Sequence, residues 1–582
     1  MNHHYAKLIL CTFSLSLVLS GPAFAQNVRQ LHVVETGDIH GAWFDEPYVD
    51  GGQTRNSLMS IKYYVDSLRA AVGAENVILV DAGDCLQGDN ATYYFNNIAD
   101  RSQPHPFPRL AKAIGYDAVV VGNHDIETGH EVYDKLLAEM EGAGVPWLAG
   151  NVLRQADGGT YFPLYKMVKK AGVNVAIIGF GNPNIREWLP ENKFTGMDFL
   201  SLAPYAQALI DFVVKKEKPD VVVVVAHSGT GTEEPEDLES QSLYLFNTLK
   251  GVDVLVGGHD HARYIASKQG MVYLNAGAKA QYVGHAVIDL RFAGRRIVTK
   301  DVSGEICKID KNKVDWILKS QFEKEFNAVK AFTNQKVGTL QNTFRSRDAY
   351  FGQNDYVSLV HRVQLSVPEA QVSFAAPLTY DGVVDKGTLV YNDMFTVYPY
   401  ENELFVVRMK GSEIKAAMEF SYNMWIMTPG EHVLNIEQHQ SDRYGSQGWS
   451  FVNRSYNLDS AGGLNYTVDV TKPNGSRVNI TTLADGTAFD MDAFYNVAMT
   501  SYRASGGGES ISEGAGLNPE QVNERIVMKY PAIRDMVYDF FKSHDEISSG
   551  LINDPSVVGT WKFVPEDIVK PLLDNDRKLL FE

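Results

Sequence analysis

The amino-acid sequence predicts an α/β protein in two parts, with a layered α/β domain first and a mixed α+β domain after it. Three observations support this fold class. The chain has 582 residues, which is more than a single hydrophobic core usually serves. In the first half, strand-like runs of Val, Ile and Leu alternate with amphipathic stretches, as in sheets whose faces are covered by helices. From about residue 337 the pattern changes.

Six strands are expected in the first half. Several are continuous apolar runs, which are typical of strands buried on both faces. The six are Leu31–Glu35, Val77–Val80, Ala118–Val121, Val173–Ile178, Val221–Val225 and Val252–Val256. Amphipathic helices are predicted between them, for example at Ser57–Arg69, His130–Met140 and Pro204–Val214. In such a layered domain, ligands bind beyond the ends of the strands.

A helix is predicted over Asp315–Phe332, between the two halves, because apolar residues recur there at helical spacing. An ordinary packed helix has the same pattern, but its position makes it a candidate connector. Further on, the sequence predicts a helix at Lys410–Asn423 and strands at Asn465–Val470 and Tyr495–Thr500. Residues 551–582 contain three prolines and no clear periodicity, and we expect them to wrap over the surface of the second domain.

Composition excludes one class of partner. The formal net charge is -18, which argues against a nucleic-acid polymer, because phosphate backbones favour surfaces rich in Lys and Arg. A small phosphorylated metabolite is compatible with this charge, since a local pair of metal ions would offset the repulsion. The hydrophobic content of 45% and the charged content of 21% are ordinary for a soluble globular protein.

The N-terminus has the pattern of an export signal. Lys7 precedes an apolar run that reaches to about residue 19, and small residues at 23 and 25 suit cleavage before Gln26. An uncleaved anchor is the alternative, but the run is short for a membrane span, and no later segment reaches ~18 uninterrupted apolar residues. We therefore predict a signal peptide at 1–25, secretion across the inner membrane to the periplasm, and no stable membrane span.

Two cysteines remain after the signal, Cys85 and Cys307. A disulfide between them is possible but nothing in the sequence supports it, and two cysteines do not make a disulfide-stapled scaffold. Cys85 follows Asp84 directly and could be mistaken for a metal ligand. A buried thiol is the favoured interpretation.

Short polar clusters stand where five of the predicted strands end. They supply His, Asp and Asn, the side chains that bind divalent metals through nitrogen and oxygen. No single loop surrounds two ions, so a two-metal hydrolase needs several strand ends to converge. Glycines beside the clusters allow the tight turns that convergence requires. The clusters are Asp38-Ile-His40, Gly83-Asp84, Gly122-Asn123-His124-Asp125, Ala226-His227 and Gly257-Gly258-His259-Asp260-His261.

The chemistry of phosphate-ester hydrolysis suggests a role for each cluster. Asp84 is the candidate bridging ligand, because a carboxylate offers two anionic oxygens to two ions. Asp38 and His40 would bind one metal together. Taken singly, a strand-end Asp is usually a turn or cap residue and a lone His a core or surface group, so the recurrence at successive strand ends carries the prediction. The remaining donors are Asn123, His227 and His259 for the second metal, and His261, which could return to the first.

These clusters match the metallophosphoesterase pattern D-x-H, G-D-x-x-x-G, G-N-H-[DE], H and G-H-x-H. The arrangement resembles the 5'-nucleotidase family of exported enzymes, from about Leu31 to at least Gly508. The resemblance implies a catalytic β-sandwich flanked by helices, joined to an α+β nucleotide-binding domain. It also implies that His124 stabilises developing charge or protonates the leaving oxygen. One metal would lie on Asp38, His40, Asp84 and His261, and the other on Asp84, Asn123, His227 and His259.

One position departs from the family pattern. Many members have an Asp three residues after the catalytic His, where it orients the imidazole, whereas this chain has Glu127. A carboxylate that is one methylene longer could still bond a ring N–H, so we predict that Glu127 orients His124. A solvent-facing Glu at the start of a helix is the alternative.

Two segments of the second half are candidates for holding a nucleobase. Tyr400 and Tyr502 fall at the family's two base-stacking positions, and Asn402 falls at a neighbouring polar contact. Stacking on Tyr tolerates any base, because every base has a π face. A single Tyr is more often a core residue, so the resemblance carries this prediction. Plausible sugar or phosphate contacts, each with a surface arginine as the alternative, are Arg345, Arg347 and Arg503.

The substrate stays open between two branches of the superfamily. The G-G-[IV]-R and G-G-D-G segments typical of 5'-nucleotidases are replaced here by Phe374-Ala-Ala-Pro-Leu378 and Gly506-Gly-Gly508-Glu509. The segments Ser346–Gly352, Tyr398–Asn402 and Tyr502–Gly507 are similar instead to 2',3'-cyclic-nucleotide 2'-phosphodiesterases with 3'-nucleotidase activity. The substrate is therefore expected to be a 5'-nucleotide or a 2',3'-cyclic or 3'-nucleotide.

We therefore predict an exported two-metal phosphohydrolase that removes phosphate from small nucleotides for scavenging, with Zn, Mn, Fe or Co as its two divalent metal ions. The alternatives are a metallophosphoesterase for a non-nucleotide ester and a catalytically inactive surface binding protein on the same fold. The predicted division is a signal peptide at 1–25, a metallophosphoesterase domain at 26–308, a linker helix at 309–336, a substrate-binding domain at 337–550 and a C-terminal tail at 551–582.

Overall fold

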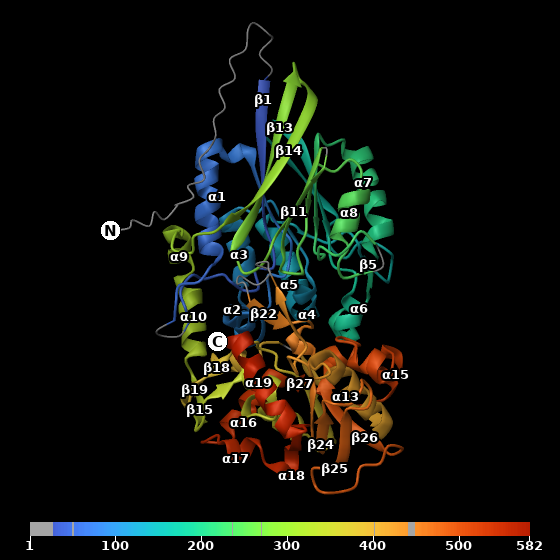
Figure 1. The fold of residues 1–582 in the computed structure, drawn as a ribbon. Helices are drawn as coiled ribbons and strands as arrows, with labels where there is room; N and C mark the ends of the chain where they lie inside the picture. The colour runs from blue at the N-terminus through green and yellow to red at the C-terminus, as the bar shows by residue number, and fades with distance from the viewer. Residues whose placement is uncertain (1–26, 49–51, 235–236, 269, 401, 440–447) are drawn as a thin grey trace, which may run out of the picture.

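The computed structural model describes residues 27–48, 52–234, 237–268, 270–400, 402–439 and 448–582. The predicted signal peptide lies outside this range. The described chain forms two lobes stacked end to end, with the first half of the sequence in one lobe and the second half in the other (Figure 1). In the described residues no helix is long and apolar enough to cross a membrane.

The first lobe contains two six-stranded sheets packed face to face. The first sheet has the order β14-β13-β1-β2-β3-β4, and β1 to β4 run parallel. Its strands are β1 (Asn27–Thr36), β2 (Val77–Asp81), β3 (Ala118–Val120), β4 (Trp147–Leu148), β13 (Tyr282–Ala293) and β14 (Arg296–Lys308).

The second sheet has the order β11-β12-β10-β9-β7-β6, with β7, β9, β10 and β12 parallel. Every residue of β9 is buried, as its unbroken apolar sequence predicts for a strand covered on both faces. The strands are β6 (Tyr165–Lys170), β7 (Val173–Phe180), β9 (Val221–Ala226), β10 (Val254–Val256), β11 (Arg263–Lys268) and β12 (Met271–Ala276).

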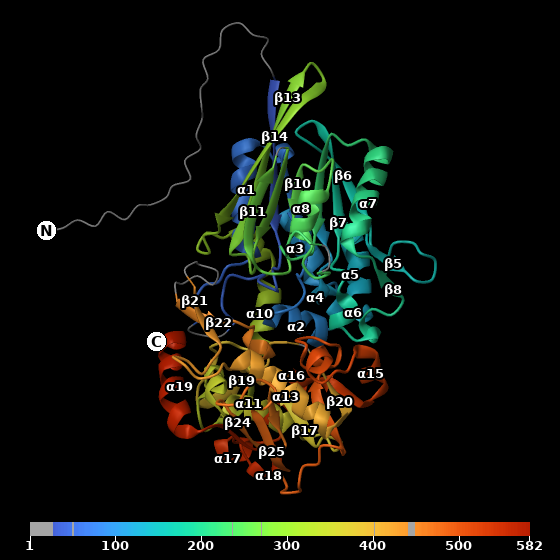
Figure 2. The same ribbon diagram turned by 45° about the vertical axis from the view of Figure 1, so that its right-hand side comes forward.

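Helices cover the outer face of each sheet, so the lobe has four layers. A core that includes Val33 and Val223 lies between the sheets. The first sheet packs its other face on α1 (Leu58–Val72), α3 (Pro106–Ile114) and α5 (His130–Ala143). The second packs on α7 (Leu202–Glu217) and α8 (Ser242–Thr248). Helix α7 lies on the opposite side of the lobe from α1 in Figures 1 and 2. The predicted helix-flanked β-sandwich is confirmed.

The six strands predicted in the first half correspond to β1, β2, β3, β7, β9 and β10, and the three predicted helices to α1, α5 and α7. The connector differs from its prediction. It forms two helices, α9 (Trp316–Gln321) and α10 (Glu323–Thr333), because the chain leaves helical geometry at Phe322, where φ is -114° and ψ is 15°. The Phe322 ring packs in the core of the first lobe, which favours the break.

Helix α10 touches both lobes. Val329 packs in the core of the first lobe and Phe332 in a core of the second. The first lobe's last strand, β14, ends at Lys308, and the second lobe's first strand, β15 (Lys336–Leu340), begins at Lys336.

The second lobe is built on a five-stranded sheet of order β23-β17-β26-β20-β27. The helix predicted at Lys410–Asn423 is α13 (Gly411–Trp425), and the two predicted strands are β24 (Leu464–Asp469) and β26 (Phe494–Thr500). The other strands of the sheet are β17 (Val372–Ala375), β20 (Glu403–Lys410), β23 (Ser460–Gly462) and β27 (Ile526–Ala532).

The C-terminal segment is part of the second lobe's architecture. Strand β28 (Gly559–Val564) pairs in parallel with β24, and β25 (Val478–Leu483) lies on the other side of β24. Helix α19 (Glu566–Phe581) then packs Val569 and Leu573 into the lobe's core. Residues 551–582 therefore complete a sheet, which their prolines and missing periodicity did not reveal.

Candidate metal centre at the strand ends

The five polar clusters meet at one end of the first lobe. β1, β2 and β3 are parallel in one sheet and β9 and β10 in the other, so the residues that follow them emerge at the edge where the two sheets face each other. Side chains that could hold a metal ion form two groups there, Asp38 with His40 and His261, and Asp84 with His227 and His259. Within each group the potential ligand atoms lie within 4.8 Å of one another.

The backbone at these residues is strained. Asp38, His40, Asp84, His259 and His261 all have positive φ, between 47° and 75°. Residues with a Cβ occupy this left-handed region at a cost of order 1–3 kcal/mol each, and such strain gathers at functional sites. In the described chain, half of the ten non-glycine residues with positive φ belong to the predicted metal set.

Glycine is required beside Asp84 for a steric reason. A Cβ on Gly122 would lie 2.1 Å from Asp84 Oδ1 and 2.4 Å from the Asp84 backbone nitrogen. The start of α4 (Asn123–Glu127) therefore approaches the Asp84 turn as closely as two backbones allow. This contact lets the His124 backbone N–H donate to Asp84 Oδ1 at 2.9 Å.

In the first group, hydrogen bonds orient His40 toward the other members. His40 Nδ1 lies 3.0 Å from the Gln87 carbonyl, which accepts the ring N–H and leaves the Nε2 lone pair directed inward. His40 Nε2 lies 2.8 Å from His261 Nε2 and 4.0 Å from Asp38 Oδ1. Two imidazole nitrogens that face each other beside a carboxylate form a donor set that fits a divalent cation.

The second group has the same design. His227 Nδ1 donates to the Ala82 carbonyl at 2.7 Å, so its Nε2 faces Asp84 Oδ2 at 3.2 Å and Asn123 Oδ1 at 2.9 Å. Asn123 Oδ1 also lies 2.9 Å from His259 Nδ1. Nitrogen and oxygen donors from the residues that follow β3, β9 and β10 therefore converge. This group too fits a divalent cation.

Asp84 lies between the two groups. Its Oδ2 is 3.2 Å from His227 Nε2 and 3.9 Å from His40 Nε2. Asp84 and Asp38 are both buried, and two buried carboxylates need compensating positive charge. Burial raises the pKa of Asp38 well above its ordinary value. Burial would lower the pKa of His227, but the Asp84 and Asp38 carboxylates raise it to about 10. The pocket therefore favours cations.

Asp125 holds the Asp84 turn in place, a role that the sequence analysis did not assign. Its carboxylate accepts hydrogen bonds from the backbone N–H groups of Asp84, Cys85 and Leu86, at 2.9 to 3.1 Å, and of Gly122, at 2.8 Å. The fourth residue of the G-N-H-[DE] motif was the available signal. Cys85 donates its thiol to Asp81 Oδ1 at 3.2 Å, and in the described chain it is not joined to Cys307 by a disulfide.

Glu239 and Trp188 position His259 and were also missed. Glu239 Oε1 accepts from His259 Nε2 at 3.0 Å, while the Trp188 ring stacks on the imidazole at 5.1 Å. A carboxylate on the outer nitrogen of a ligating His fixes its tautomer and ring orientation. Arg454 of the second lobe lies 3.9 Å from the same Glu239 oxygen. No sequence pattern linked these residues, because Glu239 lies in a loop.

His124 and Glu127 form a pair at the edge of the centre. His124 Nδ1 lies 2.5 Å from Glu127 Oε2, so the orienting contact expected from the sequence is present. Burial would lower the pKa of His124, but Asp84 and Glu127 raise it to about 9. The His124 ring lies 5.4 Å from the His40 ring. Because Glu127 contacts Nδ1 of His124, the Nε2 atom of His124 is the ring nitrogen left to bond a ligand.

The second lobe reaches this centre through Arg454, which lies 3.9 Å from Glu239 Oε1 and donates to the Tyr456 hydroxyl at 2.7 Å. Burial raises the pKa of Tyr400, a predicted base-stacking residue, and Tyr456, Tyr502 and Glu127 raise it further. The Tyr400 and Tyr456 rings are 6.5 Å apart at 65°. Burial raises the pKa of Tyr502, and Tyr456 and Glu239 raise it further. Tyr456 was not predicted, because its segment shows no periodic pattern.

Arg503 does not fit the predicted role of a substrate contact. Its side chain is buried, with Nε 2.6 Å from Asp459 Oδ2, and its remaining N–H groups bond Asn457, Gly507 and Tyr456. The hydrogen bonds of the guanidinium thus stabilise the 501–508 segment. The Arg503 Cζ atom lies 5.2 Å from the centroid of the Tyr502 ring. Asn402 is half-buried near Tyr400, and its carbonyl accepts from the Ile533 N–H.

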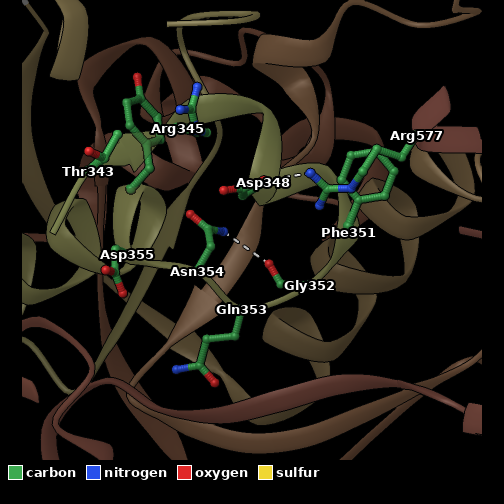
Figure 3. A pocket seen from close by; sticks show the side chains of 10 residues that line it. Thr343, Arg345, Asp348, Phe351, Gly352, Gln353, Asn354, Asp355 and Arg577 are labelled. Carbon is green, nitrogen blue, oxygen red and sulfur yellow. Dashed lines mark hydrogen bonds and ion pairs between the residues drawn. The ribbon is translucent and has the colours of Figure 1, made fainter. Parts of the chain in front are cut away.

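Arg345 and Arg347 lie in another part of the second lobe. Arg345 lines a polar hollow of about 350 Å³ together with Asn354, Asp348 and Arg577, and Arg577 is paired with Asp348 at 2.7 Å (Figure 3). Arg347 lies 3.5 Å from Asp381. None of the three tyrosines or the strand-end residues lines this hollow.

Comparison with known proteins agrees with this architecture. Residues 31–263 match the calcineurin-like phosphoesterase family, and residues 336–512 match the 5'-nucleotidase C-terminal domain. The two matches divide along the two lobes.

Relatives with assigned activities cover most of the chain. The chain is 22% identical to a 2',3'-cyclic-nucleotide 2'-phosphodiesterase/3'-nucleotidase from Yersinia enterocolitica, over 96% of this chain and 92% of that protein. A protein of the same name from Haemophilus influenzae is 24% identical over 97% and 92%. A 5'-nucleotidase from Vibrio vulnificus is 26% identical over 67% and 75%.

Solved structures show the same fold. A Staphylococcus aureus protein solved with alpha-ketoglutarate superposes with a TM-score of 0.75 at 19% identity, covering 92% of this chain and 99% of that one. A 5'-nucleotidase precursor from Thermus thermophilus gives 0.61 at 20% identity, covering 92% and 100%. Both lobes and their order are therefore shared.

Proposed function

We propose that this member of the metallophosphoesterases with a 5'-nucleotidase C-terminal domain, a metal-dependent phosphoester hydrolase, dephosphorylates small nucleotides with two divalent ions. The observation that carries the proposal is the contact of the second lobe with the strand-end centre: Arg454 lies 3.9 Å from Glu239 and donates to the Tyr456 hydroxyl at 2.7 Å, and the Tyr456 ring lies 6.5 Å from the Tyr400 ring. Aromatic faces at that place would hold a base while the ester lies at the strand ends.

The residues that would hold the ions are the two groups that share Asp84. Asp38, His40, His261 and Asp84 would hold one, and Asp84, Asn123, His227 and His259 the other. Bound ions of this kind activate water and neutralise charge on the phosphoryl group. The donors suit Zn, Mn, Fe or Co.

His124 and Glu127 would act on the leaving group. Glu127 holds Nδ1 of the imidazole, which leaves Nε2 as the nitrogen that donates a proton to the leaving oxygen or a hydrogen bond to the phosphoryl oxygens. Burial around Asp38 and Asp84 excludes bulk water from the ester and strengthens these interactions. The second lobe would orient the nucleoside through its tyrosines.

We favour 2',3'-cyclic and 3'-nucleotides as substrates. Two relatives named for these activities align over nearly the whole chain, whereas the Vibrio vulnificus 5'-nucleotidase aligns over 67% of it. That 5'-nucleotidase has the higher identity, 26%, so 5'-nucleotides are the second candidate. The same proposal includes export to the periplasm, a scavenging role and the domain boundaries predicted above.

A substrate panel tests the proposal. Purified protein with Mn²⁺ would be assayed on 2',3'-cyclic AMP, 3'-AMP, AMP, a UDP-sugar and an aryl phosphate. We expect the first two to have the highest kcat/KM. Higher kcat/KM for AMP would support the second candidate, and preference for the aryl phosphate would overturn nucleotide specificity. No turnover of any ester by the metal-loaded protein would indicate the inactive binding protein.

The base clamp has its own test. Base–aromatic stacking contributes about 1–3 kcal/mol, so Tyr400→Ala and Tyr502→Ala should lower kcat/KM for nucleotides about 10- to 100-fold and leave aryl phosphate hydrolysis nearly unchanged. Tyr63→Ala, which removes an exposed ring on α1, is the control. Equal losses on both substrate types would refute the clamp.

A further inference from the structure

A third group of metal-binding side chains lies in the first lobe, away from the strand ends. His285 of β13 and Glu305 and Cys307 of β14 bring a nitrogen, a carboxylate oxygen and a sulfur within 4.8 Å of one another. His285 pairs directly with Glu305 across the two strands, and Cys307 lies two residues farther along β14. Since side chains alternate along a strand, the three share one face of the hairpin.

This group is distinct from the strand-end centre. His285 pairs with Val34 of β1, four residues before Asp38, which corresponds to about 13 Å at about 3.3 Å per residue. Val34 belongs to the core under α1, whereas its neighbour Val33 belongs to the core between the sheets. The group therefore lies on the helix-covered face of the first sheet.

A buried histidine pair orients His285. His285 Nε2 lies 2.9 Å from His32 Nδ1 of β1, and both rings are buried. When His285 donates from Nε2, its Nδ1 lone pair points to the Glu305 carboxylate, 3.8 Å away, and to the Tyr64 hydroxyl, 3.4 Å away. A ligating histidine held by a partner on its other nitrogen is the usual design of metal sites.

The donor set selects the class of metal. Thiolate and imidazole together favour Zn²⁺ and related soft or borderline cations over Mg²⁺ and Ca²⁺. Zinc bonds of 2.0–2.3 Å place tetrahedral ligand atoms about 3.5 Å apart, so the group must contract by about 1 Å. Glu305, whose side chain is 63% exposed, has the freedom to make that adjustment.

We propose that His285, Glu305 and Cys307 form a third divalent-metal site, for zinc or a similar thiophilic cation, supported by His32 and independent of catalysis. The site lies where β14, the 13-residue edge strand of the first sheet, meets β13. A metal there fastens an edge strand whose outer backbone groups are open to pairing with other chains.

Cobalt provides a direct test, because a Co²⁺–thiolate bond gives a near-ultraviolet charge-transfer absorption that a nitrogen and oxygen site does not. The full mature chain would be stripped with a chelator and titrated with Co²⁺, and bound metal would be counted by mass spectrometry. We expect the thiolate band in the wild type and in Cys85→Ser. Cys307→Ser should lose the band and one bound Co²⁺ per chain.

Matched variants separate this site from general effects. Glu305→Gln should weaken the band at limiting Co²⁺, whereas Asp301→Asn, four residues away on the same strand, should leave it unchanged. Hydrolytic activity of Cys307→Ser should equal that of the wild type. A wild-type protein without the band, or a band that persists in Cys307→Ser, would overturn the proposal. Circular dichroism of each variant checks that it folds.

Discussion

At the scale of single residues, the centre depends on side chains that touch the proposed ligands. Asp125 ties four backbone N–H groups of the Asp84 turn and α4 together, and Glu239 fixes the outer nitrogen of His259. Such partners preorganise ligands that have unfavourable backbone conformations. The strain at Asp38 and its neighbours is therefore balanced by hydrogen bonds within a few ångströms.

Glu239→Gln tests the support of His259. The amide cannot stabilise the imidazole N–H as the carboxylate does, so we expect about 10- to 100-fold weaker metal affinity, measured as the Mn²⁺ concentration that gives half-maximal activity. Glu234→Gln, an exposed change in the same loop, is the control. An unaltered Mn²⁺ dependence in Glu239→Gln would refute the role.

Asp125→Ala tests the clamp on the Asp84 turn. The substitution leaves buried backbone donors without an acceptor, at about 1–3 kcal/mol each where no water enters. We expect the free energy of unfolding of the first lobe to fall by about 3 kcal/mol or more in urea titrations. Asp211→Ala, at an exposed position on α7, should change it by less than about 0.5 kcal/mol. Equal stability of the two variants would contradict the clamp.

At the scale of elements, a buried histidine joins three parts of the second lobe. His361 of α11 (Asp355–Gln364) lies 2.6 Å from Ser373 Oγ on β17 and 3.0 Å from Ser460 Oγ on β23. Gly462 packs against the same ring, where a Cβ would lie 2.6 Å from Cγ. Burial lowers the pKa of His361 to about 3, so the ring is neutral in the folded protein.

The neutral state of His361 predicts a pH dependence of stability. Its folded pKa lies below its ordinary value of 6.5, so the unfolded chain binds the proton more tightly. The contribution of neutral His361 to the free energy of unfolding is therefore complete above pH 6.5. It is lost as the pH falls toward 3, by about 1.4 kcal/mol per pH unit. His361→Gln should flatten the pH dependence of the free energy of unfolding in urea between pH 6.5 and 5, and His130→Gln, a change at a partly exposed histidine, should not. Parallel curves for His361→Gln and the wild type would refute this.

The sequence predicted the elements whose signal is local. The Val and Ile runs of β7 and β9 identify strands buried on both faces, and parallel order brings the polar residues after them to one edge. Long-range partners leave no such signal. Arg503 was expected to contact substrate, because nothing nearby announces Asp459, which lies 44 residues earlier. Glu239, from a loop, and Tyr456, from a segment without periodicity, were missed for the same reason.

At the scale of the whole molecule, an element of the first lobe inserts a side chain into the second. Tyr93, at the end of α2 (Asn90–Tyr93), belongs to a core of the second lobe, and its hydroxyl bonds Asp535. Its ring lies 5.6 Å from that of Tyr391 and 4.9 Å from the Arg534 guanidinium. This contact fixes the lobe interface near the ends of the strands.

Tyr93→Ala tests how the lobes are coupled. Removing a buried aromatic side chain costs about 3–5 kcal/mol, and here the loss falls on the interface. We expect calorimetry to show the unfolding transitions of the two lobes farther apart in temperature than in the wild type. Tyr93→Phe should keep most of the coupling. Tyr63→Ala, which removes an exposed ring on α1, should behave as the wild type. A wild-type melting profile for Tyr93→Ala would refute the coupling.

The central claim is that the strand-end residues form a two-metal hydrolytic centre joined by Asp84. The most direct measurement is hydrolysis of 2',3'-cyclic AMP as a function of Mn²⁺ bound per chain, since Mn²⁺ disfavours thiolate sites. We predict no activity after chelation, full activity at two bound Mn²⁺ per chain, and loss of both binding and activity in Asp84→Asn. Full activity in the metal-free protein, or in Asp84→Asn without bound metal, would contradict the claim.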